Sequence, residues 1–294
     1  MTLQPAVGRS RREILGSGVV NRICRYVTPR NVERYFGARA MEVAVEAYWR
    51  RLRQRRDLAA LVTDYFVTPG SAVADIGASW GLFTHHMGRR VGSSGSVDCF
   101  EPHPLNLPAL RAAVENGRPV RVHALALSDS KGSATLHVPR AHGRSVTAQA
   151  RLAHEFANVD FDTIEIDVDL LDNVMEPAEL LDFVKIDVEG HELAVLRGGE
   201  HALRHAPPML IEIEQRHLNC DIHTAFEQIQ NLGYEMWMLK NDTLRPIGEF
   251  ALDRDQGSHV TSDFEAFSLP RGYVSNFLAV KSGTPLDGLP TSAS

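Results

Sequence analysis

The stretch VADIGASWG (residues 73–81) indicates the fold because it joins the end of an apolar strand to a turn bracketed by glycines. Val73, Ala74 and Ile76 are apolar, and they predict a strand that is buried on both faces. Asp75 places one carboxylate inside this run, where a purely structural strand would carry another apolar residue. Ligands of doubly wound sheets bind at the carboxyl ends of strands, and a glycine turn lets the backbone approach them closely. The stretch therefore predicts a ligand-binding turn at the edge of a parallel sheet.

From Ser71 onward, short apolar strands alternate with helical patterns. This alternation is typical of an α/β fold, in which helices cover both faces of a mostly parallel, Rossmann-like sheet. Two further strands are expected between residues 132 and 170, around a loop that contains AHGRS. The strands expected in the main sheet are 71–77, 95–102, 120–127, 181–190, 208–214, 234–239 and 276–280, and the expected helices include 104–115, 191–205 and 222–232.

The chain divides into three parts by composition and pattern. Residues 1–67 are expected to form an N-terminal helical extension, residues 68–280 the main domain, and residues 281–294, rich in Ser, Pro and Gly, a disordered tail. Within the extension, five apolar residues fall on one helix face. We expect this stripe to pack on the main domain or on a second subunit, the latter giving a homo-oligomer. The stripe comprises Met41, Val45, Tyr48, Trp49 and Leu52.

Charge is distributed unevenly along the chain. Residues 1–67 carry 13 Lys and Arg against 6 Asp and Glu, whereas the remainder carries 18 against 31. A basic arm can contact nucleic acid or a membrane, although a solvated helix face is the simpler interpretation. The three cysteines are scattered and form no C-x-x-C pair, which favours reduced thiols and a cytoplasmic location. No apolar run reaches transmembrane length.

The turn and the next strand indicate the ligand. Gly77 and Gly81 form G-x-x-x-G, which differs from the G-x-G-x-x-G of dinucleotide sites. Glu101 ends the second strand, where an acid accepts hydrogen bonds from ribose hydroxyls. Together they predict a nucleoside ligand that needs no pyrophosphate turn, and S-adenosylmethionine (SAM) fits this description.

The chain resembles the FkbM family of SAM-dependent O-methyltransferases over roughly residues 70–280. The resemblance rests on VADIGASWGLFT, VDCFEPHPLNLPAL, HALALSDSKGSATL, LDFVKIDVEGHELAVLRGGEHAL, PPMLIEIE, LGYEMW and NFLAV, in that order. It implies a class I methyltransferase fold, a seven-stranded sheet with only the last strand antiparallel. It also implies methylation of a hydroxyl on a sugar, oligosaccharide, glycolipid or glycosylated natural product.

The resemblance also assigns cofactor-binding residues. Ser79 stands in the turn where the family commonly has Asn, and Trp80 follows it where a smaller aliphatic residue is common. The positions that match the family's cofactor segments are Asp75, Gly77, Ser79 and Gly81 in the first motif, Glu101 for the ribose, Asn106 after it, and Ser128 and Asp129 near the adenine.

Four carboxylates are expected to meet where two neighbouring strands end: Asp187, Glu189, Glu212 and Glu214. Helix capping explains one of these acids but not four. Two chemistries remain open: a carboxylate that accepts the proton of the acceptor hydroxyl, and a Mg²⁺ site that acidifies that hydroxyl. We expect Asp187 and Glu212 to hold the metal and Glu189 to act as the base. Glu214 or His191 would support Glu189, and His142 and His217 are weaker candidates.

Two other functions are consistent with parts of the sequence. A nucleic-acid methyltransferase would use the basic arm, but KIDVEG stands where base-modifying enzymes often carry [DN]-P-P-[YF], and the acidic main domain repels phosphates. A non-catalytic nucleoside-binding module would not need Glu189, Glu212 or Glu214. A small-molecule, saccharide or glycolipid acceptor, with no nucleic acid and no transmembrane segment, is therefore the favoured interpretation.

Overall fold

The computed structural model describes most of the chain. The described residues are 29–114, 117–141, 144–145, 150–152, 160–176, 180–257 and 272–292. His142, one of the candidate histidines, lies outside them.

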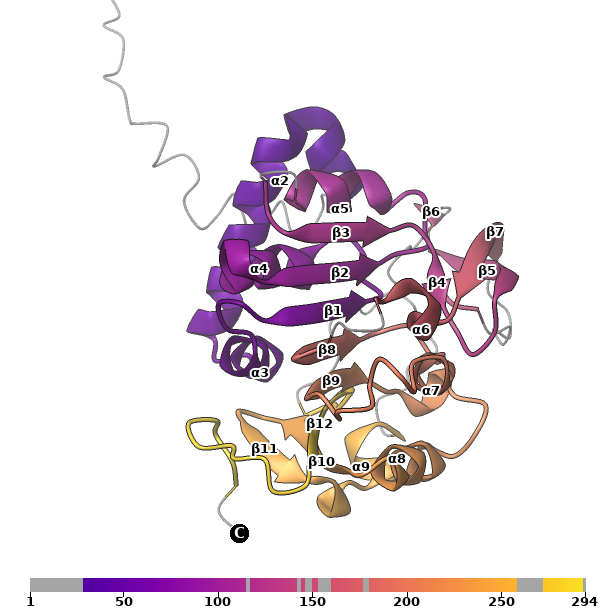
Figure 1. Ribbon diagram of the computed structural model, residues 1–294. Coiled ribbons are helices and arrows are strands. Elements are labelled where there is room, and N and C mark those ends of the chain that lie inside the picture. Colours follow the sequence, from indigo (N-terminus) through magenta and orange to yellow (C-terminus); the bar gives the residue numbers. More distant parts are fainter. Residues whose placement is uncertain are drawn as a thin grey trace, which may run out of the picture.

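An eight-stranded sheet forms the centre of the molecule (Figure 1). Six strands, β1, β2, β3, β8, β9 and β10, run in one direction, and β12 lies antiparallel between β9 and β10. This is the α/β class I methyltransferase arrangement expected from the sequence, extended by one hairpin strand, β11, which the sequence did not predict. In spatial order the strands are β11 (Thr243–Pro246), β10 (Tyr234–Lys240), β12 (Asn276–Lys281), β9 (Met209–Glu212), β8 (Phe183–Ile186), β1 (Ala72–Ile76), β2 (Ser96–Phe100) and β3 (Val120–His123).

Strand order reverses between β1 and β8. The chain runs outward from β1 through β2 to β3, and then returns to the opposite side of β1 to form β8 and β9. Both β1 and β8 are parallel, so their carboxyl ends lie at the same edge of the sheet. A reversal of this kind is where doubly wound sheets bind ligands.

Alternating strand residues build a core on each face of the sheet. On β8, Val184 and Ile186 pack with side chains of α7 and α8, while Phe183 packs with those of α3 and α4. The helices are α2 (Pro29–Gln54), α3 (Leu58–Phe66), α4 (Leu82–Val91), α5 (Leu107–Val114), α6 (Leu171–Val174), α7 (Glu192–Arg197), α8 (Ile222–Asn231) and α9 (Leu252–Asp255), with 3₁₀ turns at Gly92–Ser94, Gln215–His217 and Ile247–Glu249. The helix expected over 191–205 is therefore shorter, because Gly198 and Gly199 follow its last residue.

A small second sheet stands beside the carboxyl edge of the main sheet (Figure 1). It contains the two strands expected between residues 132 and 170, together with two very short ones. Its order is β4 (Ala126–Leu127), β7 (Phe161–Asp169), β5 (Gly132–Ala141) and β6 (Arg144–Ser145). β5 and β7 pair over eight residues as an antiparallel hairpin.

The stripe on α2 packs on α4 and α5 of the same chain, the first of the two expected alternatives. Met41 and Val45 are fully buried and join the core formed by α5. Trp49 stacks on His86 with ring centroids 3.9 Å apart. Several arginines near the end of α2 form ion pairs within the chain, such as Arg53 with Asp64 at 2.8 Å. Part of the basic charge therefore serves the fold.

The C-terminal segment is packed over residues 281–292, contrary to the expectation of a disordered tail. Leu289 is buried in the core that contains Leu244 of β11. The Leu244 amide donates to the Pro290 carbonyl at 2.7 Å, and the Ser292 amide donates to the Leu244 carbonyl at 2.9 Å. The composition, rich in Ser, Pro and Gly, suggested disorder, but the leucines among these residues supply buried apolar surface. The segment covers the open edge of β11.

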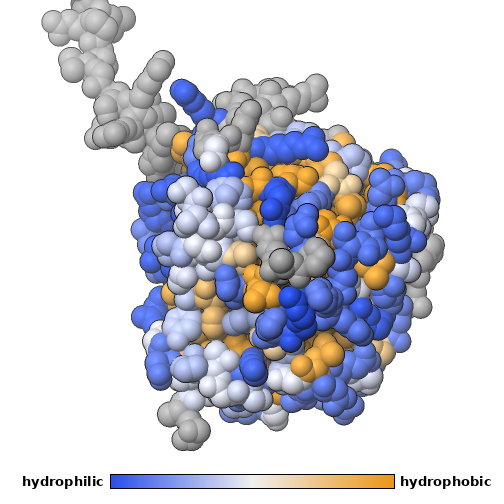
Figure 2. Space-filling view, viewed as in Figure 1, coloured by the Kyte–Doolittle hydropathy of each residue, from blue (hydrophilic) through white to orange (hydrophobic). Residues whose placement is uncertain are grey.

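The described helices include none that is both long and apolar enough to cross a bilayer. The face seen in Figure 2 is a mixture of hydrophilic and hydrophobic residues. Val43, Leu180 and Leu232 are the exposed large aliphatic residues among those described.

The packing of α2 predicts a large stability difference between two of its residues. Trp49→Ala removes a side chain that is 3% exposed, and it should lower the free energy of unfolding by about 3–5 kcal/mol. Val43→Ala alters a side chain on the same helix that is 49% exposed, and its effect should stay within about 0.5 kcal/mol. Urea unfolding measures both, and equal losses would contradict the packing of α2.

Candidate functional site

The turn after β1 lies directly against the loop after β8. Gly77 has φ +82°, and a Cβ at this position would come within 1.8 Å of the Asp187 carbonyl oxygen. The Asp187 amide in turn donates to the Ile76 carbonyl at 2.9 Å. Gly81, with φ +90°, precedes the first residue of α4. The two glycines bring the turn close to the β8 loop and start the next helix. The sequence predicted the glycine turn but not its contact with that loop.

Glu101 connects this turn to the end of β2. Its Oε2 accepts the Ser79 amide at 2.7 Å, and its Oε1 accepts the His103 amide at 2.8 Å and the Asn106 Nδ2 at 3.2 Å. Burial raises the pKa of the Glu101 carboxyl to about 7, although these three hydrogen bonds favour the ionised form. Three of the predicted cofactor residues, Ser79, Glu101 and Asn106, therefore form one hydrogen-bonded unit.

Asp75 is fully buried beneath the turn. Its Oδ2 accepts the Thr84 hydroxyl of α4 at 2.5 Å, and its Oδ1 lies 3.8 Å from Lys185 Nζ. Burial raises the pKa of the Asp75 carboxyl. Its contacts support the turn from below, which is a structural role within the cofactor motif.

Lys185 is a buried cation that the sequence analysis did not single out. Its Nζ lies 3.0 Å from Asp187 Oδ2 and 5.0 Å from the centre of the Phe83 ring. The available signal was a lysine inside the apolar run LDFVKI, because a lysine in a buried strand needs a carboxylate partner.

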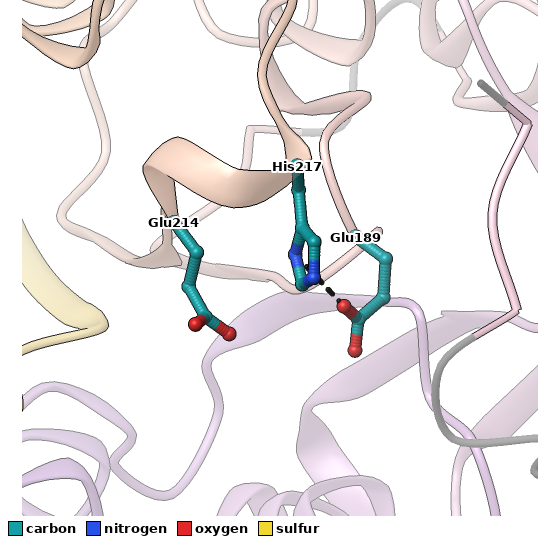
Figure 3. Close-up of side chains that lie close together, drawn as sticks. All are labelled: Glu189, Glu214 and His217. Atoms are coloured by element: carbon teal, nitrogen blue, oxygen red, sulfur yellow. Dashed lines mark ion pairs between the residues drawn. The ribbon is translucent and has the colours of Figure 1, made fainter. Parts of the chain in front are cut away.

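Two of the four acids expected at the ends of β8 and β9, Glu189 and Glu214, lie close to His217 (Figure 3). Glu189 Oε2 lies 2.9 Å from Nδ1 of His217. One ligand atom from each of Glu189, Glu214 and His217 falls within 4.8 Å of the others. His217 stands between the two glutamates in this view. We call these three residues the Glu–Glu–His cluster.

Gly190 explains how two separate loops hold this cluster. It has φ +100°, and a Cβ there would meet the His217 carbonyl oxygen at 2.2 Å. The β8 loop can therefore lie against the 3₁₀ turn Gln215–His217 only because residue 190 has no side chain. That contact brings Glu189 to His217.

The three members of the Glu–Glu–His cluster differ in charge. Burial, together with the nearby Asp187 and Glu214, raises the pKa of the Glu189 carboxyl well above its usual range. Burial lowers the pKa of His217 to about 4, so this imidazole is neutral at neutral pH. For Glu214, burial acts to raise the pKa, but hydrogen bonds from Arg216 help to lower it overall. Arg216 Nε and Nη2 each lie 2.9 Å from a Glu214 oxygen, and the Tyr273 hydroxyl also donates to that carboxylate.

The expected metal pair, Asp187 and Glu212, does not fit a divalent cation. The Lys185 ammonium contacts Asp187 directly. Burial and the charges of Asp187, Glu189 and Glu214 raise the pKa of the Glu212 carboxyl well above its usual range. Within the described part of the chain, the group close enough to share an ion is the Glu–Glu–His cluster, and there Arg216 already binds Glu214 through two nitrogens.

His191, Ser128 and Asp129 lie together at a contact between the segment after β4 and the start of α7. His191 Nε2 is 2.8 Å from the Ser128 hydroxyl, so His191 supports the segment after β4 and is not seen to contact the acids. Asp129 is 41% exposed at its side chain and pairs with Arg197 at 2.9 Å. The position beside Glu189 that His191 was expected to take belongs to His217, which the sequence analysis ranked lower.

A cavity joins these elements. Its polar wall contains Ser79, Glu101, Arg151, Asp187, Glu189 and His191. Its apolar wall comes from the ends of β1 and β2 and from the small sheet with its neighbouring segments. The apolar lining residues are Ile76, Phe100, Pro102, Leu125, Ala126, Leu127, Leu136, Ala150, Leu152 and Val188. The cavity therefore presents both an apolar and a polar wall.

Comparisons with known proteins were made at the level of family, curated sequence and structure. A family model described as a methyltransferase FkbM domain matches residues 71–236, more than half of the chain. No curated protein matches it.

Solved structures that share this arrangement are distant. A SAM-dependent O-methyltransferase from Thermotoga maritima is 13% identical, with 76% of this chain and 63% of that chain covered and a TM-score of 0.41. An Aeropyrum pernix fibrillarin with bound SAM is 12% identical, covering 77% and 75%, with a TM-score of 0.42. The Synechocystis magnesium protoporphyrin IX methyltransferase with bound SAM is 12% identical, covering 92% and 95%, with a TM-score of 0.42.

The contact at Gly190 predicts a stability loss beyond that of backbone strain. Gly233→Ala provides the matched control, because Gly233 has φ +90° but nothing within 4 Å of an added Cβ. That control should cost about 1–2 kcal/mol from the left-handed backbone alone. Gly190→Ala should cost clearly more, because its Cβ also collides with the His217 carbonyl. Thermal and urea unfolding compare the two, and equal losses would contradict the close contact of the two loops.

Proposed function

Because the chain belongs to the FkbM family of SAM-dependent methyltransferases, we propose that it methylates a hydroxyl of a sugar, oligosaccharide, glycolipid or glycosylated natural product. The observation that supports this proposal most directly is the contact between Glu189 and His217. Glu189 lines the same cavity as Glu101, so a base and a ribose-binding acid share one space.

The residues of the cavity suit SAM. The Glu101 carboxylate retains lone pairs for ribose hydroxyls, while Phe100, Leu125 and Leu127 offer apolar surface to an adenine ring. Asp187 adds negative charge to the polar wall, which favours a cationic ligand. When bound, SAM supplies an electrophilic methyl group.

Glu189 is the residue we assign as general base. A sugar hydroxyl is a very weak acid, and an unperturbed glutamate titrates near about 4.3, so an ordinary carboxylate is a poor match. The raised pKa of Glu189 narrows that gap. His217 is neutral and contacts the Glu189 carboxyl, so it fixes its orientation without neutralising a charge. Glu214, with Arg216 and Tyr273 as partners, supports the cluster from the other side.

A small hydroxylated acceptor suits the charge of the protein better than a nucleic acid does. Beyond residue 67 the chain carries 31 Asp and Glu against 18 Lys and Arg, which repels a phosphate backbone. The side chains of Glu189 and Asp187 can instead accept hydrogen bonds from neighbouring hydroxyls of a polyol.

The assignment of Glu101 predicts a pH-dependent affinity. Glu101→Ala removes the acceptor of the ribose hydroxyls, and it should weaken binding of S-adenosylhomocysteine (SAH) by about 1–3 kcal/mol. In the unchanged protein the ionised carboxylate is the better acceptor, so affinity should rise as pH increases through about 7. Calorimetry at several pH values measures both effects. Glu235→Ala, an exposed change on β10, should alter neither. Unchanged SAH affinity in Glu101→Ala would rule out this role.

The assignment of Glu189 predicts a loss of turnover with retained cofactor binding. Glu189→Gln should lower methyl transfer by roughly 10²–10⁴-fold, the usual contribution of a general base. Because the base must be ionised and its pKa is raised, the rate in the unchanged protein should increase with pH. The variant should lose that increase. The assay uses labelled SAM with a panel of sugars, glycolipids and aglycones, and Glu235→Gln serves as the control. Turnover near normal in Glu189→Gln would show that another group takes the proton.

A further inference from the structure

Lys185 does not line the cavity itself, but it contacts Asp187, which does. The residue lies in β8, and its side chain is 7% exposed. A buried ammonium is stable only when carboxylates compensate it. Two do so: Asp187 Oδ2 at 3.0 Å and Asp75 Oδ1 at 3.8 Å. The ring of Phe83 covers another side at 5.0 Å.

This arrangement leaves the acids in excess. One ammonium faces two carboxylates, and the charge of Glu212 also acts on Lys185. Asp187 lines the cavity itself, and Asp75 lies two residues before Gly77, which also lines it. Lys185 therefore offsets part of the negative charge that Asp187 brings to the wall, in addition to Arg151, which lines the cavity itself.

The cosubstrate and the product of methyl transfer differ in charge at one atom. SAM carries a sulfonium, and SAH carries a neutral thioether in its place. A negative wall stabilises the sulfonium form selectively, and a cation in that wall reduces the preference. A wall that strongly stabilises the sulfonium of bound SAM also lowers the energy of the ground state, which slows methyl transfer. A cation that weakens this stabilisation leaves the ground state higher in energy before transfer.

We propose that Lys185 is a specificity-determining residue that sets the relative affinity of the protein for SAM and SAH. The inference rests on the proposed function, since it concerns the cofactor of that reaction. In this proposal the buried lysine of KIDVEG affects ligand affinity in addition to forming ion pairs within the fold.

Two substitutions test the inference because they should act in opposite directions. Lys185→Met keeps an unbranched side chain and removes the positive charge. It should raise the SAM affinity relative to the SAH affinity by about tenfold, well below the full effect of a unit charge in a partly buried site. Asp187→Asn removes a negative charge from the same wall, and it should lower that ratio. Calorimetry with SAM and SAH separately, at one pH and ionic strength, gives the ratio without any acceptor.

Lys240→Met is the matched control. Lys240 is also largely buried, with a side chain 16% exposed, and it forms an ion pair with the buried Asp255. It lies on β10, and neither residue lines the cavity. Its loss should lower stability and leave the ratio unchanged.

The outcomes separate the inference from the proposed function. An unchanged protein that binds neither SAM nor SAH would overturn both. If it binds both ligands, but Lys185→Met weakens them equally, Lys185 has only a structural role and the inference is overturned. Should Lys185→Met fail to fold, Lys185→Gln, which also removes the charge, decides: a raised ratio supports the inference, and an unchanged ratio overturns it.

Discussion

The close approach of the turn after β1 to the loop after β8 is the constraint on which the rest of the site depends. The two segments meet because β1 and β8 are parallel neighbours at the point where strand order reverses. Their helices then leave on diverging paths, and the ends of the strands are left to line a cavity. A side chain at residue 77 would occupy the space of the Asp187 carbonyl. The close approach of the two segments therefore requires glycine at position 77.

Several carboxylates lie near the carboxyl edge of the sheet, and each has different partners. Glu214 is bound through two nitrogens of Arg216 and stays ionised, whereas Glu189 faces a neutral imidazole and holds its proton more tightly. Asp187 has the ammonium of Lys185. Carboxyl groups of one chemical type therefore differ in proton affinity within a few ångströms, and the role proposed for Glu189 depends on that difference.

The sequence predicted the central sheet, the glycine turn after β1 and the position of Glu101 after β2, because these features depend on local patterns. An apolar strand, a glycine turn and an acid at the next strand end follow from residues close together in the chain. The neighbour of Glu189 depends instead on the contact of Gly190 with the turn at His217, 27 positions further along. Nothing in the local pattern distinguishes His217 from His191, which follows Gly190 directly but contacts Ser128. The expected metal pair overlooked a local signal instead: a lysine inside the buried run LDFVKI needs a carboxylate partner, and Asp187, two residues on, is that partner.

The small sheet can change in sequence and length more freely than the main sheet. The β5–β7 hairpin bonds mainly to itself, and it joins the rest through β4, a strand of two residues. It nevertheless contributes Leu136 to the cavity wall, next to Ala126 and Leu127 of β4. A loop of this kind can lengthen, shorten or change composition without disturbing the register of the eight central strands. Such changes would alter this part of the cavity wall, while the strand ends of the main sheet that carry Glu101 and Asp187 would stay as they are.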